Sequence, residues 1–250
     1  MRLTSTCCAL VLGFTVLTGA SAQPSQPRVL VDSSRDGGGW WFPQASGFHE
    51  GQPHQGKALA GYLKSQGHTV KELPRPTTVT AELLAGADLV IRAGGTGDYT
   101  AAEIEAYDRW VKAGGRLLLL SDHHPHDALA EHFGLKFEGI ALAHGSPTAT
   151  KLAKFATHPL THNVAPLGYL GGSGLTADPA GATVLGWLAK GDFLDLNDNK
   201  KQDAGEPSSP AALGILPLGK GKIVFCGDVN LWEAVPQPLV KNTLAYFAAP

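Results

Sequence analysis

The hydrophobic residues of this chain fall in short runs that are separated by polar and glycine-rich turns. Apolar runs turn polar at the ends of Arg28–Ser34 and Arg116–Asp122, as buried strands do at their carboxyl ends, and a third run, Ala87–Ala93, is closed by Gly94-Gly95. Between the second and third runs, Thr100 and Glu103 form a capping box, and apolar residues then recur at helical spacing up to a glycine pair. The pattern therefore predicts strands that alternate with helices.

Further apolar segments extend this alternation along the chain. Helices are predicted at Lys57–Gln66, 128–134 and 236–248. Strands are predicted at His68–Leu73, 137–142, 166–170, 183–189, 211–216 and Lys222–Asp228. The alternation gives way to short strands beyond Leu135. We therefore expect one α/β domain with a mainly parallel sheet, helices on both faces and a strand-rich insertion in the C-terminal half.

The N-terminal end differs from this domain. Residues 1–22 combine Arg2, an apolar run from Cys8 to Leu17 and a final Ala-Ser-Ala, which is typical of a cleaved secretory signal peptide. Residues 23–27 form a leader rich in Gln and Pro, and 28–250 form the domain. We therefore expect an exported protein, periplasmic or extracellular, without a membrane span.

Cysteine content and charge exclude several classes of protein. Removal of the signal peptide leaves only Cys226, so no intramolecular disulfide can form. It also removes Arg2, which changes the formal net charge from −2 to −3, and the remaining Lys and Arg are scattered. We therefore expect neither nucleic acid nor an anionic membrane as a partner.

The segment Asp195–Glu206 has the spacing of a calcium-binding loop. The ligands predicted at positions 1, 3, 5, 7, 9 and 12 of that template are Asp195, Asn197, Asn199, Lys201 through its carbonyl, Asp203 and Glu206. Lys200 stands where the sharp turn prefers glycine, and Gln202 where an apolar residue is usual. A closed oxygen cage leaves no position for a substrate, so we predict a structural Ca²⁺ site. The alternative is a polar surface turn that binds nothing.

Several segments in a fixed order carry a resemblance to a known family. Asp88–Asp122 begins D-L-V-I-R-A-G-G and ends R-L-L-L-L-S-D, and segments 155–164, 195–206 and 219–228 follow it. Together they resemble the class I glutamine-amidotransferase-like superfamily. The most similar branch is exported, of unknown function, and related to the trehalose-utilisation and intraflagellar-transport amidotransferase-like domains. The resemblance covers about residues 28–248 and implies a flavodoxin-like fold.

The resemblance also implies a catalytic cysteine, which this chain lacks. Active members carry it on a sharp turn after the strand that corresponds to Arg116–Asp122, where this chain reads Ser-Asp-His-His-Pro. They also carry a histidine and an acid near the last strand, where this chain reads Gly-Asp-Val-Asn at 227–230. Cys226 lies in an apolar strand, which hides a sulfur and raises the pKa of a thiol. We therefore do not expect glutamine hydrolysis by the family's mechanism.

The carboxyl ends of the parallel strands form the predicted ligand site, because backbone N–H groups and helix N-termini converge there. The residues that this rule selects for ligand binding are Asp32, Ser33, Arg92, Gly94, Gly95 and Asn230. The catalytic candidates at the same edge are Asp122, His123, His124 and Asp228. As an alternative, Gly94 and Gly95 only permit a tight turn.

Histidine and carboxylate groups are concentrated in the segment Asp122–Asp127. Imidazole and carboxylate together suit Zn²⁺ or another transition metal. The spacing matches no defined metal motif, so the alternative is solvated loop histidines with Asp127 as a helix cap. His49 and His54, in the long loop after the first strand, are candidate polar contacts to the same edge.

These observations support two functions. The first is an exported, non-catalytic amidotransferase-like module that binds a small-molecule or protein ligand and is stabilised by Ca²⁺. The second is a metal-dependent hydrolase that uses the Asp122–His126 cluster and metal-activated water. Because one fold hosts many functions, the site must decide between them.

Overall fold

The computed structural model describes residues 27–35, 56–94, 98–122, 126–143, 150–177 and 180–249. The predicted signal peptide and all of the predicted leader except its last residue lie outside these ranges. Within them, no helix combines the length and the hydropathy that a membrane span needs.

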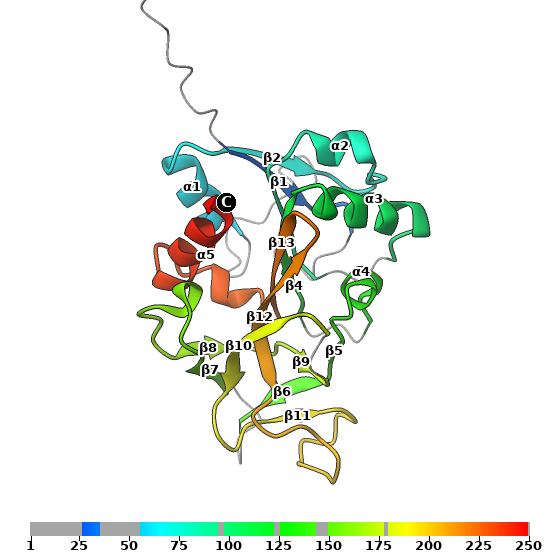
Figure 1. Cartoon of the computed structure of the whole chain (residues 1–250). Helices are drawn as coiled ribbons and strands as arrows, with labels where there is room; N and C mark the ends of the chain where they lie inside the picture. The colour runs from blue at the N-terminus through cyan, green and yellow to red at the C-terminus, as the bar shows by residue number, and fades with distance from the viewer. Residues whose placement is uncertain are drawn as a thin grey trace, which may run out of the picture.

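A mixed sheet of nine strands runs through the described part of the chain in the order β2-β1-β3-β4-β13-β12-β10-β7-β8 (Figure 1). The parallel strands are β1 (Arg28–Asp32), β2 (Thr69–Leu73), β3 (Leu89–Arg92), β4 (Arg116–Leu120) and β13 (Gly221–Cys226). The strands that continue the sheet in antiparallel pairing are β12 (Ala211–Leu218), β10 (Thr183–Leu188), β7 (Thr150–Phe155) and β8 (Leu167–Tyr169). The parallel part is therefore built from the first half of the chain and one late strand.

Two short antiparallel pairs lie beside this sheet. The first joins β6 (Ile140–Leu142) to β11 (Phe193–Asp195), and the second joins β5 (Phe137–Glu138) to β9 (Gly174–Leu175). Both pairs belong to the strand-rich half of the chain, and β11 leads directly into the predicted calcium loop.

Helices cover both faces of the sheet, and each face has its own hydrophobic cluster. Figure 1 shows α1 (Lys57–Ser65) and α5 (Pro238–Ala248) on one side of the strands, and α2 (Ala81–Ala85), α3 (Ala101–Lys112) and α4 (Ala128–His132) on the other. Two short 3₁₀ turns, η2 (Pro159–Thr161) and η3 (Asn230–Trp232), complete the elements of the described residues. The predicted α/β class with helices on both faces is confirmed.

The four leucines of β4 explain why this strand lies in the centre. Leu117 and Leu119 belong to the cluster under α2, α3 and α4, whereas Leu118 and Leu120 belong to the cluster under α1 and α5. A strand that is buried on both faces reads as a continuous apolar run. Each buried leucine contributes about 2 kcal/mol through removal of apolar surface from water.

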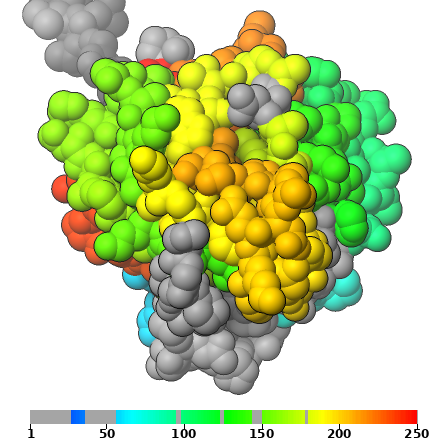
Figure 2. All heavy atoms as spheres, turned by 90° about the horizontal axis from the view of Figure 1, so that it is seen from below, coloured from blue at the N-terminus to red at the C-terminus, as the bar shows by residue number. Residues whose placement is uncertain are grey.

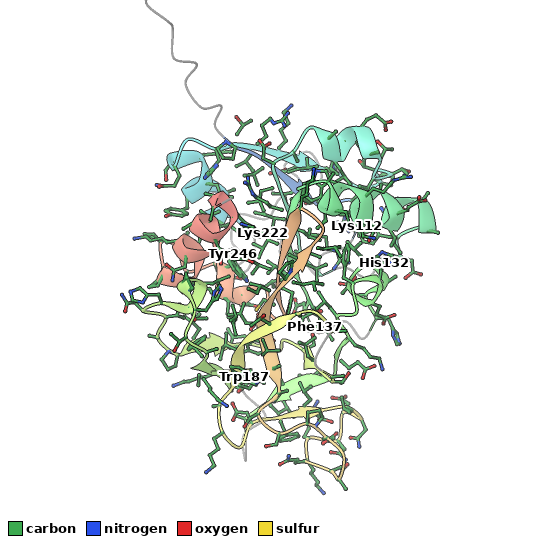
Figure 3. All side chains as sticks on the ribbon, viewed as in Figure 1. Lys112, His132, Phe137, Trp187, Lys222 and Tyr246 are labelled. Carbon is green, nitrogen blue, oxygen red and sulfur yellow. The ribbon has the colours of Figure 1, made fainter. Side chains whose placement is uncertain are left out.

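The closing helix α5 is attached to β13 by one lysine. The Lys222 ammonium lies 5.0 Å from the centre of the Tyr246 ring and donates to the carbonyl of Ala249 at 2.7 Å. Figure 3 labels the two side chains beside each other. This contact holds the end of the chain against the start of the last parallel strand.

Sequence predictions and structure differ in several elements: the predicted strand 137–142 is divided into β5 and β6, and the short strands β9 and β11 were not predicted. Helix α2 was not predicted because five residues are too few to show helical periodicity, although Thr80 caps it by accepting from the amide of Leu83. Strand β7 was not predicted either, and with it the sheet extends through antiparallel strands beyond β13. The C-terminal half therefore enlarges the same sheet rather than standing apart from it.

Candidate functional site

The chain reverses its direction across the sheet between β1 and β3. From β1 it passes to β2 on one side, and it then returns to β3 on the other side of β1. Ligands of open α/β sheets bind at the carboxyl ends of the strands at such a topological switch point. Asp32 and Arg92 end these two strands and are partners in the register of the parallel pair.

Asp32 is the centre of a buried hydrogen-bond network. Its Oδ2 accepts from the hydroxyl groups of Tyr99 at 2.7 Å and Tyr107 at 2.5 Å, and its Oδ1 accepts from the amide of Ser34 at 2.9 Å. Burial, followed by the charge of Asp32, raises the pKa of both tyrosines. Both phenols therefore keep their protons and act as donors to the Asp32 carboxylate.

Arg92 is 1% exposed and lies against the same network. Its Nε donates to the Tyr99 hydroxyl oxygen at 3.3 Å, and its Nη1 forms an ion pair with Asp127. Burial alone would lower the pKa of Arg92, but the interactions with Asp127, Tyr99 and Asp32 together outweigh it, so the pKa is raised and the guanidinium stays charged. The remaining nitrogen, Nη2, has no hydrogen-bond partner among the described residues.

Two other predicted ligand residues lie at the ends of the same strands. A Cβ atom at Gly94 would stand 2.9 Å from the amide nitrogen of Asp122, so only glycine allows the ends of β3 and β4 to approach so closely. Ser33, directly after β1, is buried, and its Oγ has no hydrogen-bond partner among the described residues. Gly95 lies outside the described residues.

The turn after β4, where the amidotransferase nucleophile would stand, carries Ser121 and Asp122. Both residues are buried. Ser173 lies against them, since its hydroxyl donates to the carbonyl of Asp122 at 2.8 Å and lies 3.3 Å from Oγ of Ser121. A serine from the strand-rich half therefore holds this turn in place.

Asp228 follows β13 and is fully buried. Its carboxylate accepts from the amides of Leu170 at 2.6 Å and Asn230 at 2.7 Å. Burial raises the pKa of Asp228 to about 7, with a further contribution from the charge of Asp122. The same two causes raise the pKa of Glu233 to about 7. Three acids at this end of the sheet are thus coupled by their charges.

Cys226 is the last residue of β13 and is completely buried. Burial raises the pKa of its thiol to about 12. A nucleophilic cysteine needs an accessible thiolate, and the buried Cys226 thiol does not meet this requirement.

The predicted calcium loop is closed by hydrogen bonds to its own acidic residues. The Asp195 carboxylate accepts from the amides of Asn199 at 3.2 Å and Lys200 at 2.8 Å. Glu206 accepts from the amides of Leu196 and Asp203, both at 2.8 Å. Asp203 in turn accepts from the side-chain amides of Asn197 at 2.8 Å and Asn199 at 2.5 Å. The first and last predicted ligands thus organise the two ends of the loop.

Backbone conformation shows how this loop turns at Lys200, where the calcium template prefers glycine. Lys200 has a φ of 64° and Asp198 a φ of 60°, both in the left-handed region. The loop, which includes Lys201, lies at the lower end of the molecule in Figure 1, and Figure 2 shows yellow and orange atoms of this part at the surface. Among the described residues, no three His, Cys, Asp or Glu side chains converge as a metal site.

The predicted transition-metal segment lies only partly in the described residues. His123 and His124 lie outside them, as do His49 and His54. His126 is exposed, with Nδ1 at 3.7 Å from Glu131. Asp127 is the N-cap of α4, where its Oδ1 accepts from the amide of Ala130 at 3.0 Å. The interpretation of Asp127 as a helix cap is confirmed.

Sequence reasoning did not identify four side chains of this edge. They are Tyr99, Tyr107, Ser173 and Glu233. Tyr107 lies on the buried face of α3 and reads as an ordinary core residue in the sequence. Ser173 lies between short strands, in a segment without any motif. Only the tertiary fold brings these residues to the sheet edge.

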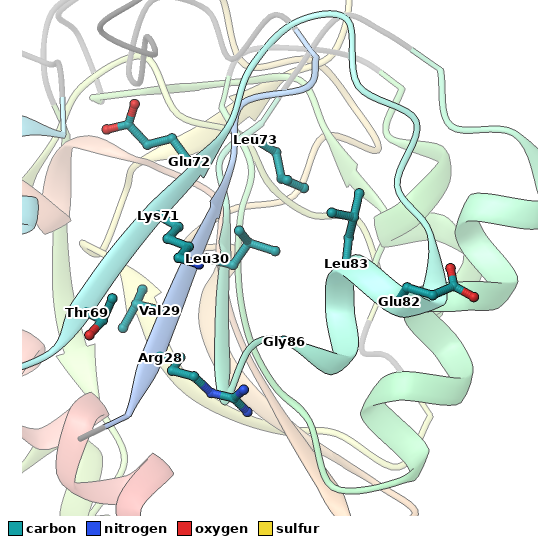
Figure 4. A pocket seen from close by; sticks show the side chains of 10 residues that line it. All are labelled: Arg28, Val29, Leu30, Thr69, Lys71, Glu72, Leu73, Glu82, Leu83 and Gly86. Carbon is teal, nitrogen blue, oxygen red and sulfur yellow. The ribbon is translucent and has the colours of Figure 1, made fainter. Parts of the chain in front are cut away.

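A groove of about 570 Å³ lies away from this edge, between β1, β2 and α2. Figure 4 shows Leu30, Leu73 and Leu83 converging across it. The charged residues that line it are exposed or partly exposed, as at Lys71 and Glu82. Its volume suits a ligand, but it holds none of the buried charges that mark the carboxyl edge.

Known proteins share the family and the fold of this chain. A family model described as a domain of unknown function, DUF4350, matches residues 50–233. No curated protein matches the chain. Solved structures with a similar fold include the mmIFT52 N-terminal domain, 15% identical with a TM-score of 0.63 over 89% of this chain and 98% of that one.

Two further solved structures share the arrangement. A ThuA-like protein from Bacteroides uniformis ATCC 8492 is 12% identical, with a TM-score of 0.56 over 92% of this chain and 95% of that one. The cold-adapted β-galactosidase from Rahnella sp. R3 is 16% identical, with a TM-score of 0.55 over 90% of this chain but 32% of that one. At such identities the likeness shows a shared fold and nothing about activity.

Proposed function

We propose that this domain, which belongs to the DUF4350 family of domains of unknown function, is a non-catalytic, exported binding module. Its ligand, a small molecule or a segment of another protein, binds at the carboxyl edge of the parallel strands. The loop Asp195–Glu206 binds Ca²⁺ and stabilises the domain. Within the α/β class we assign the sheet to the flavodoxin-like group, because its parallel strands carry helices on both faces.

The observation that carries this proposal is the gathering of buried charge at one edge. The charged residues buried there are Asp32, Arg92, Asp122, Asp127 and Asp228. Burial of a charge costs several kcal/mol unless partners compensate it, and apolar residues would fill such positions with less penalty. Charged groups that a fold does not need for its stability mark functional sites.

Among the described residues of this edge, no accessible thiol and no serine paired with a histidine base is found, which supports binding rather than amide hydrolysis. Ser121 and Asp122 occupy the turn after β4, and the hydroxyl of Ser173 holds the Asp122 carbonyl. The thiol of Cys226 is buried in β13 with a raised pKa. Neither serine has a histidine base among the hydrogen bonds of the described residues.

Export and calcium are linked parts of the same proposal. The N-terminal segment with its Ala-Ser-Ala end supports secretion. Outside the cell, calcium reaches millimolar concentrations, at which even a weak loop is filled. The hydrogen bonds of Asp195, Asp203 and Glu206 already hold the loop in a turn, so little ordering is left for the cation to impose.

A thermal-shift screen of the full-length chain tests the binding function. The library contains uncharged, anionic and cationic polar compounds. The variants are Asp122→Asn and Asp228→Asn, and the matched control is Asp192→Asn, a buried acid outside this edge. A glutaminase assay runs in parallel, with no release of ammonia expected.

The expected result is a class of compounds that raises the Tm of the wild type and of the Asp192 variant but not of the edge variants. A ligand that binds only the folded state must raise the Tm by mass action. Hits that shift all four proteins equally would place binding elsewhere and contradict the proposal. Turnover of glutamine by the wild type would contradict its non-catalytic part.

A further inference from the structure

Two arginines approach the ring of Tyr99, and they differ in how fully they are bonded. The guanidinium carbons of Arg35 and Arg92 lie 4.6 Å and 5.3 Å from the ring centre. In Arg35, Nε donates to the Asp98 carbonyl at 3.0 Å, Nη1 to the Thr77 carbonyl at 3.2 Å, and Nη2 to both oxygens of Glu103 at 2.7 Å. Every nitrogen of Arg35 therefore has an acceptor.

Arg92 is more deeply buried than Arg35, and yet its Nη2 has no acceptor in the part of the chain that the structure describes. Buried charged donors without partners are unfavourable and rare in folded proteins. The rest of the guanidinium is held by Tyr99 and Asp127, and Tyr99 is held in turn by Asp32. Nη2 is therefore a donor in a fixed position, which is what a preorganised binding site requires.

The position of Arg92 strengthens this reading. It ends β3 beside Asp32 on β1, at the switch point of the sheet, where ligands of this fold class bind. The exposed apolar groove along β2 lacks any such buried donor among its lining residues.

The charges around Arg92 define which ligand fits. Asp32 and Asp127 contribute two carboxylates against one guanidinium, while Arg35 and Glu103 form a separate ion pair. The formal balance of this network is negative. An anion would be repelled by the two carboxylates at low dielectric, whereas an uncharged oxygen accepts a hydrogen bond without this penalty.

We propose that Nη2 of Arg92 is the recognition group of a binding site at the β1–β3 switch point, and that its ligand is an uncharged molecule that presents an oxygen acceptor. The inference rests on the proposed binding function and specifies its ligand class. Nothing in the proposed function itself requires Arg92 or an uncharged ligand.

The test uses two probes of the same shape, acetamide and acetate, which differ in charge. Both are titrated into the ¹⁵N-labelled full-length chain at constant ionic strength. The readout is the Nε–Hε resonance of Arg92, assigned by its loss in Arg92→Lys. We expect a saturable shift of this resonance with acetamide and none with acetate. For so small a probe, affinity in the millimolar range is the expectation.

Two variants and a control separate recognition from folding. Arg92→Lys keeps the charge beside Asp127 but loses the planar fork. Arg92→Met combined with Asp127→Asn removes both partners, so no unpaired charge is buried, and asparagine still caps α4. In both, backbone amides around the switch point should lose the acetamide response. Arg35→Lys, which alters the fully bonded arginine, should keep it.

Several results would overturn the inference. One is a resonance shift with acetate equal to the shift with acetamide. Another is an acetamide response that survives in the Arg92 variants. The third is no saturable response to acetamide, in which case Nη2 bonds an ordered water only. Failure of this inference can be told apart from failure of the proposed binding function. If a compound from the thermal-shift screen depends on Asp228 but binds Arg92→Lys as tightly as the wild type, binding at this edge stands and the role of Arg92 is wrong.

Discussion

Asp32 and Arg92 end neighbouring parallel strands as register partners, and the hydroxyl of Tyr99 connects them. The hydroxyl donates to Asp32 and accepts from Nε of Arg92, so one side chain fixes both charges. The two strands, β1 and β3, lie at the topological switch point, where the strand order reverses: the chain passes from β1 to β2 on one side and continues with β3 on the other. This relationship places a rigid, buried and charged group at the position where α/β sheets bind ligands.

The network around Asp32 should be sensitive to the loss of one hydroxyl. Tyr107→Phe removes the 2.5 Å hydrogen bond to the Asp32 carboxylate and leaves the ring in the core. Because the acceptor is charged, we expect a loss of about 1.5–3 kcal/mol in the free energy of unfolding. Urea denaturation measures it.

Tyr246→Phe is the matched control for this prediction. Tyr246 is half-buried, and its ring, rather than its hydroxyl, contacts His158 and Lys222. A change of about 0.5 kcal/mol or less is expected there. Equal effects of the two substitutions would show that the Tyr107 hydroxyl has no special role.

Stability should fall as the pH rises from 5.5 to 8. The pKa of Asp228 is raised from 3.8 to about 7 in the folded state, so the folded protein holds this proton more tightly than the unfolded chain. Its contribution is complete below about pH 4 and is lost as the pH passes through 7. The contribution amounts to roughly 4–5 kcal/mol at most, since the shift from 3.8 to about 7 spans about three pKa units and one unit corresponds to about 1.4 kcal/mol. Glu233 acts in the same direction.

Asp122→Asn identifies the origin of this pH dependence. Removal of the Asp122 charge lowers the pKa of Asp228 and Glu233, so unfolding free energies at pH 5.5 and pH 8 should differ less than in the wild type. Glu105→Gln, on the exposed face of α3, should behave as the wild type does. An unchanged slope in the Asp122 variant would mean that the coupling between these acids is absent.

Cys226 should be inert in the native protein. The thiol is buried and its pKa is raised to about 12, so almost no thiolate forms at pH 8. In a chain with Cys7→Ser and Cys8→Ser, a disulfide reagent should label no thiol until urea unfolds the domain. Rapid labelling without urea would reopen the question of a cysteine nucleophile.

If the loop Asp195–Glu206 binds Ca²⁺, the thermal stability of the domain should depend on the carboxylate of Glu206. Glu206→Gln keeps the side-chain length but replaces the closing carboxylate of the loop by an amide. We expect added Ca²⁺ to raise the Tm of the wild type and EDTA to lower it, with both effects strongly reduced in the variant. Elemental analysis before and after EDTA checks the metal itself. A calcium response that survives in Glu206→Gln would assign the cation to another place.

Local sequence signals predicted the elements that position the site. The leucine run of β4 and the capping box of Thr100 and Glu103 both appear as predicted. Their signals are local, because burial on both faces and a helix start each need only a few neighbouring residues. The rule that ligands bind at strand ends then selected Asp32, Arg92 and Asp228 from the sequence alone.

The contacts between these residues were not predictable. Tyr99 and Tyr107 are 67 and 75 positions from Asp32, and Asp127 is 35 positions from Arg92. No periodicity encodes pairs so far apart, and a tyrosine on a buried helix face looks like core. Ser173, which contacts the turn after β4, lies in a segment whose sequence shows no motif or periodicity. Such pairings depend on how whole elements pack, which a single sequence does not display.

The most direct test of binding at the carboxyl edge is a map of backbone amide shifts on addition of a compound that raises the Tm. We predict that the largest changes fall at the ends of the parallel strands, around Ser34, Asp122 and Asn230. Changes centred on Leu73 and Leu83 would place the ligand in the groove between β2 and α2 and contradict the account.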